Sequence, residues 1–188
     1  MQFFGEGGSD FRGSDVLGRG TAEAGEGQRE KKATVHAGQT IMQLAGSGAD
    51  NREIVQVLDR YAEALDTRCW GLLSAVFVQE LEFDFGEWIV SSREEAVATI
   101  RSYLDSCGPT QHLLGNYRID IDGDAARSRV YVRAFHVGVG AAAGKTYEMG
   151  GEYRDELRRT PEGWRIHRRE GAVFWEVGSR DVLGPAGS

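Results

Sequence analysis

The second half of the chain changes its hydrophobic period from about 3.6 residues to 2, which is typical of strands rather than helices. Four long segments carry this alternation: 110–121, 125–139, 145–159 and 163–177. Short turn signals separate them, namely Asp122-Gly123, an Ala-Ala-Ala-Gly run and Pro161-Glu162-Gly163. Because such turns join hairpins, the sequence predicts consecutive strands in an antiparallel sheet.

A helical pattern precedes the strands over residues 50–70. Its apolar residues recur at i, i+3, i+4 and i+7, so they lie on one stripe of a helix. These residues are Ile54, Val57, Leu58, Tyr61, Ala62 and Leu65. Asp50, followed three residues later by Glu53, has the form of a capping box. The pattern predicts an amphipathic helix whose apolar face is buried.

Two shorter helices and a strand are expected between this helix and the long strands. Residues 70–77 are expected to form a short helix and residues 81–85 a half-exposed strand. A third helix is expected near 93–105, because Ser91 and Ser92 are each followed three residues later by Glu. Three helices before a long meander predict an α+β domain, in which a strongly curved sheet wraps onto the helices and leaves a central pocket.

The chain has 188 residues, which is enough for one domain with a core. Residues 1–47 are rich in Gly and charge and poor in branched apolar residues, so a disordered tail is expected there. A flexible C-terminal tail is expected over 179–188. The α+β domain should then occupy residues 48–178.

The charge balance excludes some partners. The net charge is −7 and no block of Lys or Arg is present, which argues against nucleic acids and anionic membrane surfaces. No apolar run approaches the roughly 20 residues of a membrane span, and the first residues lack the charged segment followed by an apolar stretch that is typical of a signal peptide. Cys69 and Cys107 lack metal-ligand spacing and are expected to be reduced thiols. A cytoplasmic protein is therefore expected.

Asp66 stands at the end of the opening helix, on the edge of its buried stripe. A carboxylate is disfavoured there, because the helix C-terminus carries partial negative charge and burial removes water. Its pKa should be raised unless a cationic or proton-sharing group meets it, and a raised pKa suits a general base. The alternative is a surface Asp that caps the turn before Arg68.

Two histidines are expected to face the pocket. In the second long strand the even-numbered residues are small or apolar, and His136 is among them. The first long strand changes parity, which suggests a bulge near Gly115. Such a bulge would let His112 and Asn116 both face the cavity.

A lone inward His is more often a core residue than a catalyst, but an Asp–His pair has a mechanism. The carboxylate fixes the imidazole tautomer and stabilises the imidazolium that forms when the ring removes a proton. No Ser or Cys is placed beside the pair, so proton abstraction is favoured over acyl transfer. Zinc ligation by His112, His136 and Asp66 lacks any HxH or HExxH spacing, and no phosphate-binding Gly-rich loop is present. No metal or organic cofactor is expected.

Three stretches resemble the SnoaL-like branch of the nuclear transport factor 2-like superfamily. They are RYAEALDTRCW at 60–70, TQHLLGNYRIDIDGDAA at 110–126 and GGEYRDELRRTPEGWRIHRR at 150–169. The resemblance covers roughly residues 50–178 and implies a cone-shaped α+β barrel with a deep pocket. The superfamily holds dehydratases, isomerases, polyketide cyclases, a dehydrochlorinase and non-catalytic members.

The resemblance to bile-acid dehydratase and to hexachlorocyclohexane dehydrochlorinase implies roles for three residues. His112 matches the catalytic base of both, and Asp66 matches an Asp that pairs with this His in the dehydrochlorinase. Tyr61 stands where the dehydratase has a catalytic Tyr. Two positions depart from the pattern: a further catalytic Asp of the dehydratase falls near Ala134, and the catalytic Arg of the dehydrochlorinase falls at Thr160.

The sequence therefore predicts a cofactor-independent lyase or isomerase that acts on a mostly apolar small molecule. His112 is expected to abstract a proton, Asp66 to orient it, and Tyr61 to donate a hydrogen bond to a carbonyl or departing hydroxyl. Substrate contacts are expected from Asn116, His136, Trp70, Trp88 and Tyr153. A non-catalytic binding or homodimerising module and a small oxygenase subunit remain as alternatives. A dimer or trimer is expected.

Overall fold

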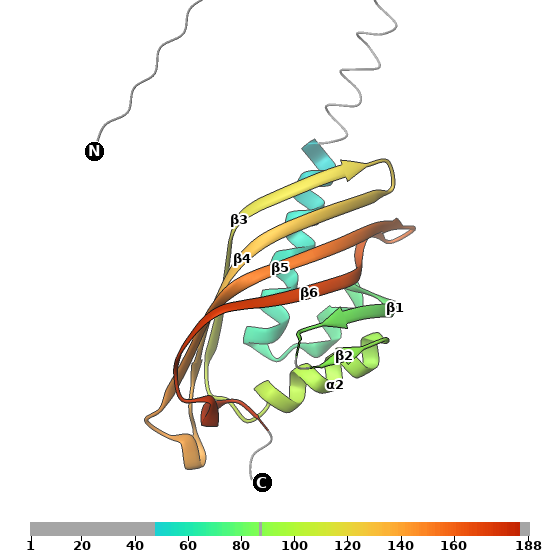
Figure 1. The fold of residues 1–188 in the computed structure, drawn as a ribbon. Coiled ribbons are helices and arrows are strands. Elements are labelled where there is room, and N and C mark those ends of the chain that lie inside the picture. The colour runs from blue at the N-terminus through green and yellow to red at the C-terminus, as the bar shows by residue number, and fades with distance from the viewer. Residues whose placement is uncertain (1–47, 87, 185–188) are drawn as a thin grey trace, which may run out of the picture. The chain divides into compact units, whose positions relative to one another are not determined.

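The computed structural model describes residues 48–86 and 88–184, so the expected N-terminal tail lies outside it. Three helices lie against a curved six-stranded sheet within these residues (Figure 1). The helices are the opening helix, described over 48–67, the 3-10 helix η1 (Trp70–Ala75) and α2 (Arg93–Leu104). The strands are β1 (Phe77–Asp84), β2 (Ile89–Val90), β3 (Thr110–Asp122), β4 (Ala125–Val137), β5 (Thr146–Thr160) and β6 (Gly163–Gly178).

The sheet has the strand order β2-β1-β6-β5-β4-β3. The four long strands form the predicted antiparallel meander, and their ends lie within two residues of the predicted ones. β1 instead pairs parallel with β6, so the sheet is mixed rather than antiparallel throughout. A hairpin turn in the sequence identifies only the two strands that it joins. β1 and β6 are far apart along the chain, so no turn signal predicts their pairing. The α+β fold with a curved sheet is confirmed.

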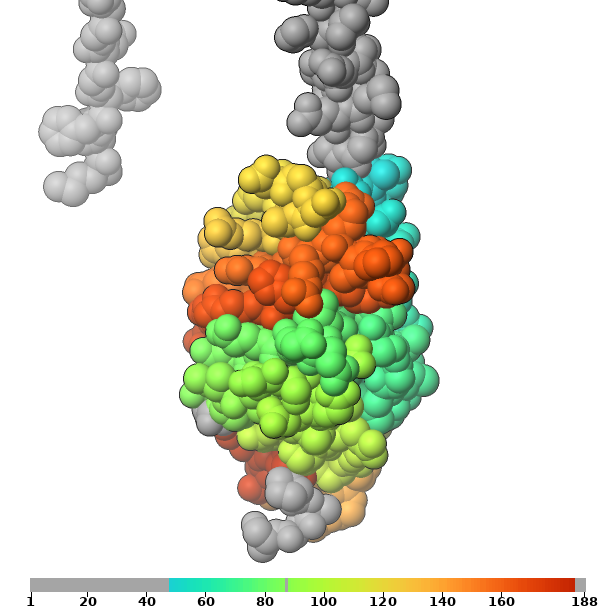
Figure 2. Space-filling view, turned by 90° about the vertical axis from the view of Figure 1, so that its right-hand side faces the viewer, coloured from blue at the N-terminus to red at the C-terminus, as the bar shows by residue number. Residues whose placement is uncertain are grey.

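The apolar stripe of the opening helix packs against the inner face of the sheet. Ile54, Leu58 and Leu65 are at most 3% exposed. The even-numbered residues of β4 are buried and the odd-numbered ones from 125 to 135 are exposed, as the sequence predicts. β1, in green, packs beside the orange β6, and α2 packs against β1 (Figure 2). The helices and the sheet thus share one core.

Both shorter helices occur where they are expected. The Ser92 side chain accepts the backbone N–H of Glu95 at 3.2 Å, and the Glu95 carboxylate accepts the backbone N–H of Ser91 at 3.1 Å. These two contacts begin α2. η1 is a 3-10 rather than an α-helix, and β1 begins at Phe77, earlier than the sequence indicates.

Bulges bend the long strands around the core. The register of β3 against β4 shifts between Gly115 and Arg118, which confirms the predicted bulge, and Asn116 there has a φ of 56°. The β5–β6 pairing shifts twice, near Gly150 and near Leu157. Each shift also changes which residues of β6 face the core.

The chain stays packed beyond the end of β6. Residues Arg180–Val182 form a short 3-10 helix, η3, in which Val182 is only 2% exposed. The Ser106 hydroxyl donates to the Gly184 carbonyl at 2.5 Å, which ties this segment to the end of α2. The domain therefore extends past the expected boundary at 178, and only residues 185–188 of the expected tail lie outside the description. No described helix has the length and apolar character of a membrane span.

Candidate functional site

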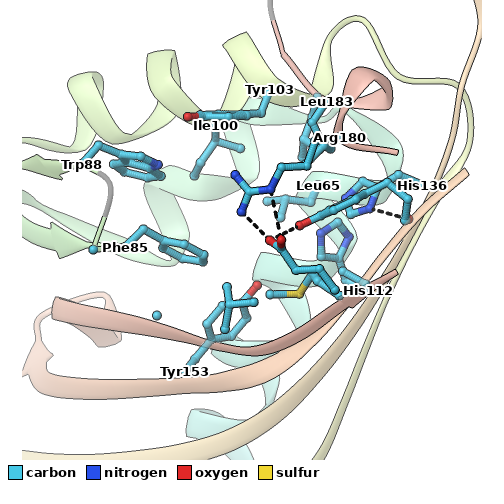
Figure 3. Close-up of a pocket in the computed structure, with 18 of the residues that line it drawn as sticks. Leu65, Phe85, Trp88, Ile100, Tyr103, His112, His136, Tyr153, Arg180 and Leu183 are labelled. Carbon is cyan, nitrogen blue, oxygen red and sulfur yellow. Dashed lines mark hydrogen bonds and ion pairs between the residues drawn. The ribbon is translucent and has the colours of Figure 1, made fainter. Parts of the chain in front are cut away.

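A cavity of about 400 Å³ lies between the inner face of the sheet, the end of the opening helix and α2 (Figure 3). Its walls are largely aromatic and aliphatic. The apolar lining includes Leu65, Phe83, Phe85, Trp88, Ile100, Tyr103, Leu104, Met149, Val173 and Leu183. An apolar pocket with a few convergent polar groups is the usual form of a small-molecule site.

The structure brings most of the predicted site residues to this cavity. Those that line it are Tyr61, Trp88, His112, His136 and Tyr153. Asp66 lies directly behind His112. Trp70 packs against the core away from the lining, and Asn116 is exposed at the β3 bulge. The expectation that Asn116 faces the cavity is wrong, because the bulge residue itself takes a left-handed conformation and turns toward solvent.

Asp66 and His112 make a close pair. Asp66 Oδ1 lies 2.6 Å from His112 Nδ1, and Asp66 Oδ2 accepts the backbone N–H of His112 at 2.9 Å. The Thr110 hydroxyl also donates to Oδ1 at 3.0 Å. A carboxylate only accepts hydrogen bonds, so we assign the imidazole proton to Nδ1, which leaves Nε2 as the basic nitrogen.

The same contacts decide the charge of Asp66. Burial raises the pKa of this carboxyl, but hydrogen bonds from the ring and backbone of His112 and from Thr110 outweigh burial, so the pKa lies below its usual value. The sequence predicted a raised pKa only where no such partner meets Asp66. An ionised Asp66 is suited to orient the imidazole and to stabilise its protonated form.

Arg68 fixes the end of the opening helix at the site. It has a φ of 57°, and its guanidinium donates to the carbonyl oxygens of Leu104 and Gly108, each at 3.1 Å. It also donates to Thr110 Oγ1 at 2.9 Å. Arg68 therefore joins the helix end, the end of α2 and the start of β3, and so holds Asp66 against His112.

His136 lies beside His112 with the two rings perpendicular and their centroids 5.4 Å apart. Its Nδ1 is 3.3 Å from the backbone carbonyl oxygen of Tyr147. Burial, followed by electrostatic repulsion from the His112 ring and from Arg68, lowers the pKa of His136 to about 4. His136 is thus a neutral imidazole near pH 7, able to hydrogen-bond a ligand.

This shift predicts a pH dependence of stability. Between the ordinary pKa of 6.5 and the folded value of about 4, the unfolded chain binds more protons at His136 than the folded protein does. The free energy of unfolding should therefore fall as the pH drops through this range, by about 3 kcal/mol for the full shift. Urea unfolding at about pH 7 and about pH 4.5 should show a smaller loss for His136→Gln than for the wild type. Equal losses would contradict the assignment.

A buried cation lies behind two of the cavity tyrosines, Tyr61 and Tyr153, and sequence reasoning missed it. Arg169 is fully buried, with its guanidinium carbon 4.1 Å from the ring centroid of Tyr61 and 4.4 Å from that of Tyr153. Asp155, also buried, accepts from Arg169 Nε at 2.6 Å and from Nη2 at 2.9 Å. Burial raises the pKa of Tyr61 although the Arg169 charge opposes this, so the Tyr61 hydroxyl keeps its proton at neutral pH.

No group of three His, Cys, Asp or Glu side chains in the described part of the chain is arranged to hold a metal ion. The polar groups of the cavity are two imidazoles, the hydroxyls of four tyrosines, and an ion pair between Glu176 and Arg180. Such groups bind and move protons without a metal.

The chain belongs to the family of SnoaL-like domains, whose model matches residues 47–170. Its fold is similar to that of a nuclear transport factor 2-like superfamily protein from Salmonella enterica, which is 17% identical with a TM-score of 0.59, over 76% of this chain and 95% of its own. An uncharacterized protein of Mycobacterium tuberculosis is 32% identical over 123 residues, which cover 64% of this chain and 83% of that protein.

Solved structures share the fold at lower identity. A protein from Novosphingobium aromaticivorans, proposed to be a scytalone dehydratase, is 21% identical with a TM-score of 0.62, over 70% of this chain and 88% of its own. A hexachlorocyclohexane dehydrochlorinase from Novosphingobium barchaimii is 15% identical with a TM-score of 0.62, over 73% of this chain and 93% of its own. At these identities the likeness concerns the fold alone.

Proposed function

We propose that this protein is a cofactor-independent lyase or isomerase that removes a proton from carbon in a mostly apolar small molecule. The observation that carries the proposal is the 2.6 Å contact between Asp66 and His112, with His112 on the wall of a largely apolar cavity. Similar structures described as a dehydratase and a dehydrochlorinase support it, since both names describe eliminations.

The reaction that fits the site best is an elimination. His112 Nε2 takes the proton from a carbon next to a carbonyl, and the electrons of the C–H bond form the new double bond. The group on the neighbouring carbon leaves with its electron pair, and the Tyr61 hydroxyl donates a hydrogen bond or a proton to it. Asp66 stabilises the imidazolium that results. Return of the proton to another carbon would make the same site an isomerase.

The proposal can be tested without knowing the natural substrate. 5-Nitrobenzisoxazole is a compact apolar molecule in which removal of one ring C–H proton breaks the N–O bond and yields a coloured cyanophenolate. A base in an apolar pocket accelerates this reaction. We expect the full-length protein to accelerate it with saturation kinetics. A rate no greater than that with free imidazole at equal concentration would reject the proposal.

The outer face of the sheet favours self-association as a second property. Six large apolar side chains are exposed on neighbouring strands there, and we call them the outer patch: Leu113, Tyr131, Phe135, Phe174, Trp175 and Val177. Monomers rarely expose so many adjacent apolar groups. The neighbouring Arg133–Glu148 ion pair offers both charge signs, which suits a two-fold contact with a second copy.

The outer patch predicts a dimer that one substitution can dissociate. Phe174, 57% exposed, contacts the Tyr131 ring, and Phe174→Asp would place a charge within the contact. Light scattering coupled to gel filtration should show a wild-type dimer and a Phe174→Asp monomer. Ile89→Asp is the matched control, since Ile89 is 65% exposed on β2, outside the patch. A monomeric wild type, or equal effects of both substitutions, would contradict the dimer.

A further inference from the structure

Three polar side chains meet at the mouth of the cavity, and none of them has a part in the proposed proton abstraction. The Tyr147 hydroxyl donates to Glu176 Oε1 at 2.6 Å, and Arg180 Nε donates to Glu176 Oε2 at 3.1 Å. Arg180 Nη2 contacts Oε1 as well. All three residues line the cavity, and Figure 3 shows the Arg180 guanidinium directed at the carboxylate. We call this group the polar corner.

A bulge turns the polar corner inward. Gly151 pairs with Val173 and Gly150 with Trp175, so Phe174 is the extra residue in β6. Simple alternation from Val173 would bury Trp175 on the cavity side and turn Glu176 outward. The bulge reverses this and places Glu176 opposite Met149, on the cavity side. The backbone therefore exposes an apolar residue and directs a carboxylate into an apolar pocket, an arrangement that stability alone does not favour.

The carboxylate keeps capacity for a ligand. The ion pair with Arg180 and the hydrogen bond from Tyr147 lower the pKa of Glu176, so it is ionised at neutral pH and accepts only. A carboxylate offers roughly four acceptor positions, and the contacts named above fill two on Oε1 and one on Oε2. The Glu176 side chain is 32% exposed, so a molecule at the cavity mouth can approach it.

The charges also select the kind of ligand. Glu176 and Arg180 carry opposite charges, so their pair attracts neither anions nor cations strongly. An acceptor-only carboxylate binds a hydroxyl or N–H and repels a ligand carboxylate. The rest of the lining is largely apolar. The matching ligand is neutral and mostly apolar, and it carries one hydrogen-bond donor at its edge.

The polar corner is connected to the proposed catalytic pair through ring contacts. The Tyr147 ring lies 5.5 Å from that of His136, and His136 lies 5.4 Å from His112. One small molecule can therefore span both ends of the cavity.

We propose that the polar corner is a recognition subsite in which Glu176 accepts a hydrogen bond from a hydroxyl or N–H group of a neutral, mostly apolar ligand. The inference rests on the proposed function in one respect, namely that this ligand is taken to be the substrate. The hydroxyl would then lie on the same ring system as the carbon that loses its proton to His112.

A pair of probes tests the subsite without any turnover. 2-Naphthol and 2-methoxynaphthalene are similar apolar molecules, but only the first donates a hydrogen bond. Their dissociation constants from the full-length protein can be measured by equilibrium dialysis near pH 7. Their ratio is compared between variants, so the difference in their own solubility cancels.

The ratio should depend on Glu176 alone. We expect the preference for 2-naphthol to fall about fivefold in Glu176→Met, because a hydrogen bond to a partly exposed carboxylate is lost. The more conservative Glu176→Gln should lower the preference for 2-naphthol by at least about 2.5-fold, because an amide oxygen is a weaker acceptor than a carboxylate oxygen. Glu148→Gln is the matched control: Glu148 also pairs with an Arg, but on the outer face of the sheet. It should leave the ratio unchanged.

The outcomes separate the subsite from the proposed function. An unchanged ratio in both Glu176 variants, or no binding of either probe, would overturn the subsite. A fall in the ratio would support it even in a protein without elimination activity, which would reject the proposed function only. His112→Ala should keep the wild-type ratio, because His112 is not the acceptor.

Discussion

Replacing His112 by Ala should lower the protein-dependent rate of 5-nitrobenzisoxazole elimination by about 10²–10⁴-fold, which is the usual contribution of a positioned general base. His112 supplies Nε2 on the cavity wall, and the 2.6 Å contact from Asp66 to Nδ1 fixes the tautomer that makes Nε2 basic. The smaller side chain removes the base but leaves the strand pairing of β3 in place. The absorbance of the product gives the rate directly.

Asp66→Asn should cause a smaller but clear loss of the same rate. The amide has no negative charge to stabilise the imidazolium. Its oxygen can still accept a hydrogen bond from the backbone N–H of His112, which donates to Asp66 Oδ2 at 2.9 Å in the wild type. The thermal stability of the variant should be measured as well, because Asp66 also accepts a hydrogen bond from the Thr110 hydroxyl and thereby joins the helix to β3. A loss of rate with retained folding identifies a role in the reaction.

His167→Ala is the matched control for the loss of an imidazole. His167 lies on β6 outside the cavity lining, so its removal should change the rate by less than about twofold. An unchanged rate in His112→Ala would refute the assignment of the base. A complete loss in His136→Ala with normal activity in His112→Ala would move the base to the second imidazole.

Much of this fold is readable from the sequence because its signals are local. Alternation and turn residues place the ends of β3 to β6 within two residues, and the capping pattern of Ser92 and Glu95 starts α2 correctly. The parallel pairing of β1 with β6 joins segments far apart in the chain, and no local pattern reports it. The residues suggested an Asp–His pair, but only the resemblance to known enzymes singled out His112 as the partner of Asp66, since a 46-residue separation has no period to follow.

Sequence reasoning missed buried residues that come after a bulge in their strand, such as Arg169 in β6. Trp164 and Ile166 face the core, so alternation would place Arg168 inside. In the structure Leu157 pairs with Ile166 and Glu156 with Arg168, which leaves His167 as an extra residue and turns Arg169 inward. A bulge flips every later side chain of the strand, and without the partner strand its position cannot be found. The only signal was the unusual density of Arg in this segment.

Removing the Asp155 side chain should destabilise the protein by about 3–5 kcal/mol, because it leaves a buried cation without its partner. Asp155 and Arg169 are both fully buried, and two hydrogen bonds of 2.6 Å and 2.9 Å join them. The third guanidinium nitrogen, Nη1, already has no hydrogen-bond partner among the described residues. Asp155→Ala would add two more unpaired donors in the core. Urea unfolding at neutral pH measures the loss.

Two further variants decide whether the missing partner, rather than the missing side chain, causes this loss. Asp124→Ala removes one of the two carboxylate partners of Arg159 at the surface, where Asp124 is 84% exposed and Asp50 remains as the other partner, and should cost less than about 1 kcal/mol. The double variant Asp155→Leu with Arg169→Met replaces the buried pair by apolar groups and should be more stable than Asp155→Ala alone. If the double variant is instead the less stable one, the Arg169 contacts with the Tyr61 and Tyr153 rings stabilise the core more than its unpaired charge destabilises it.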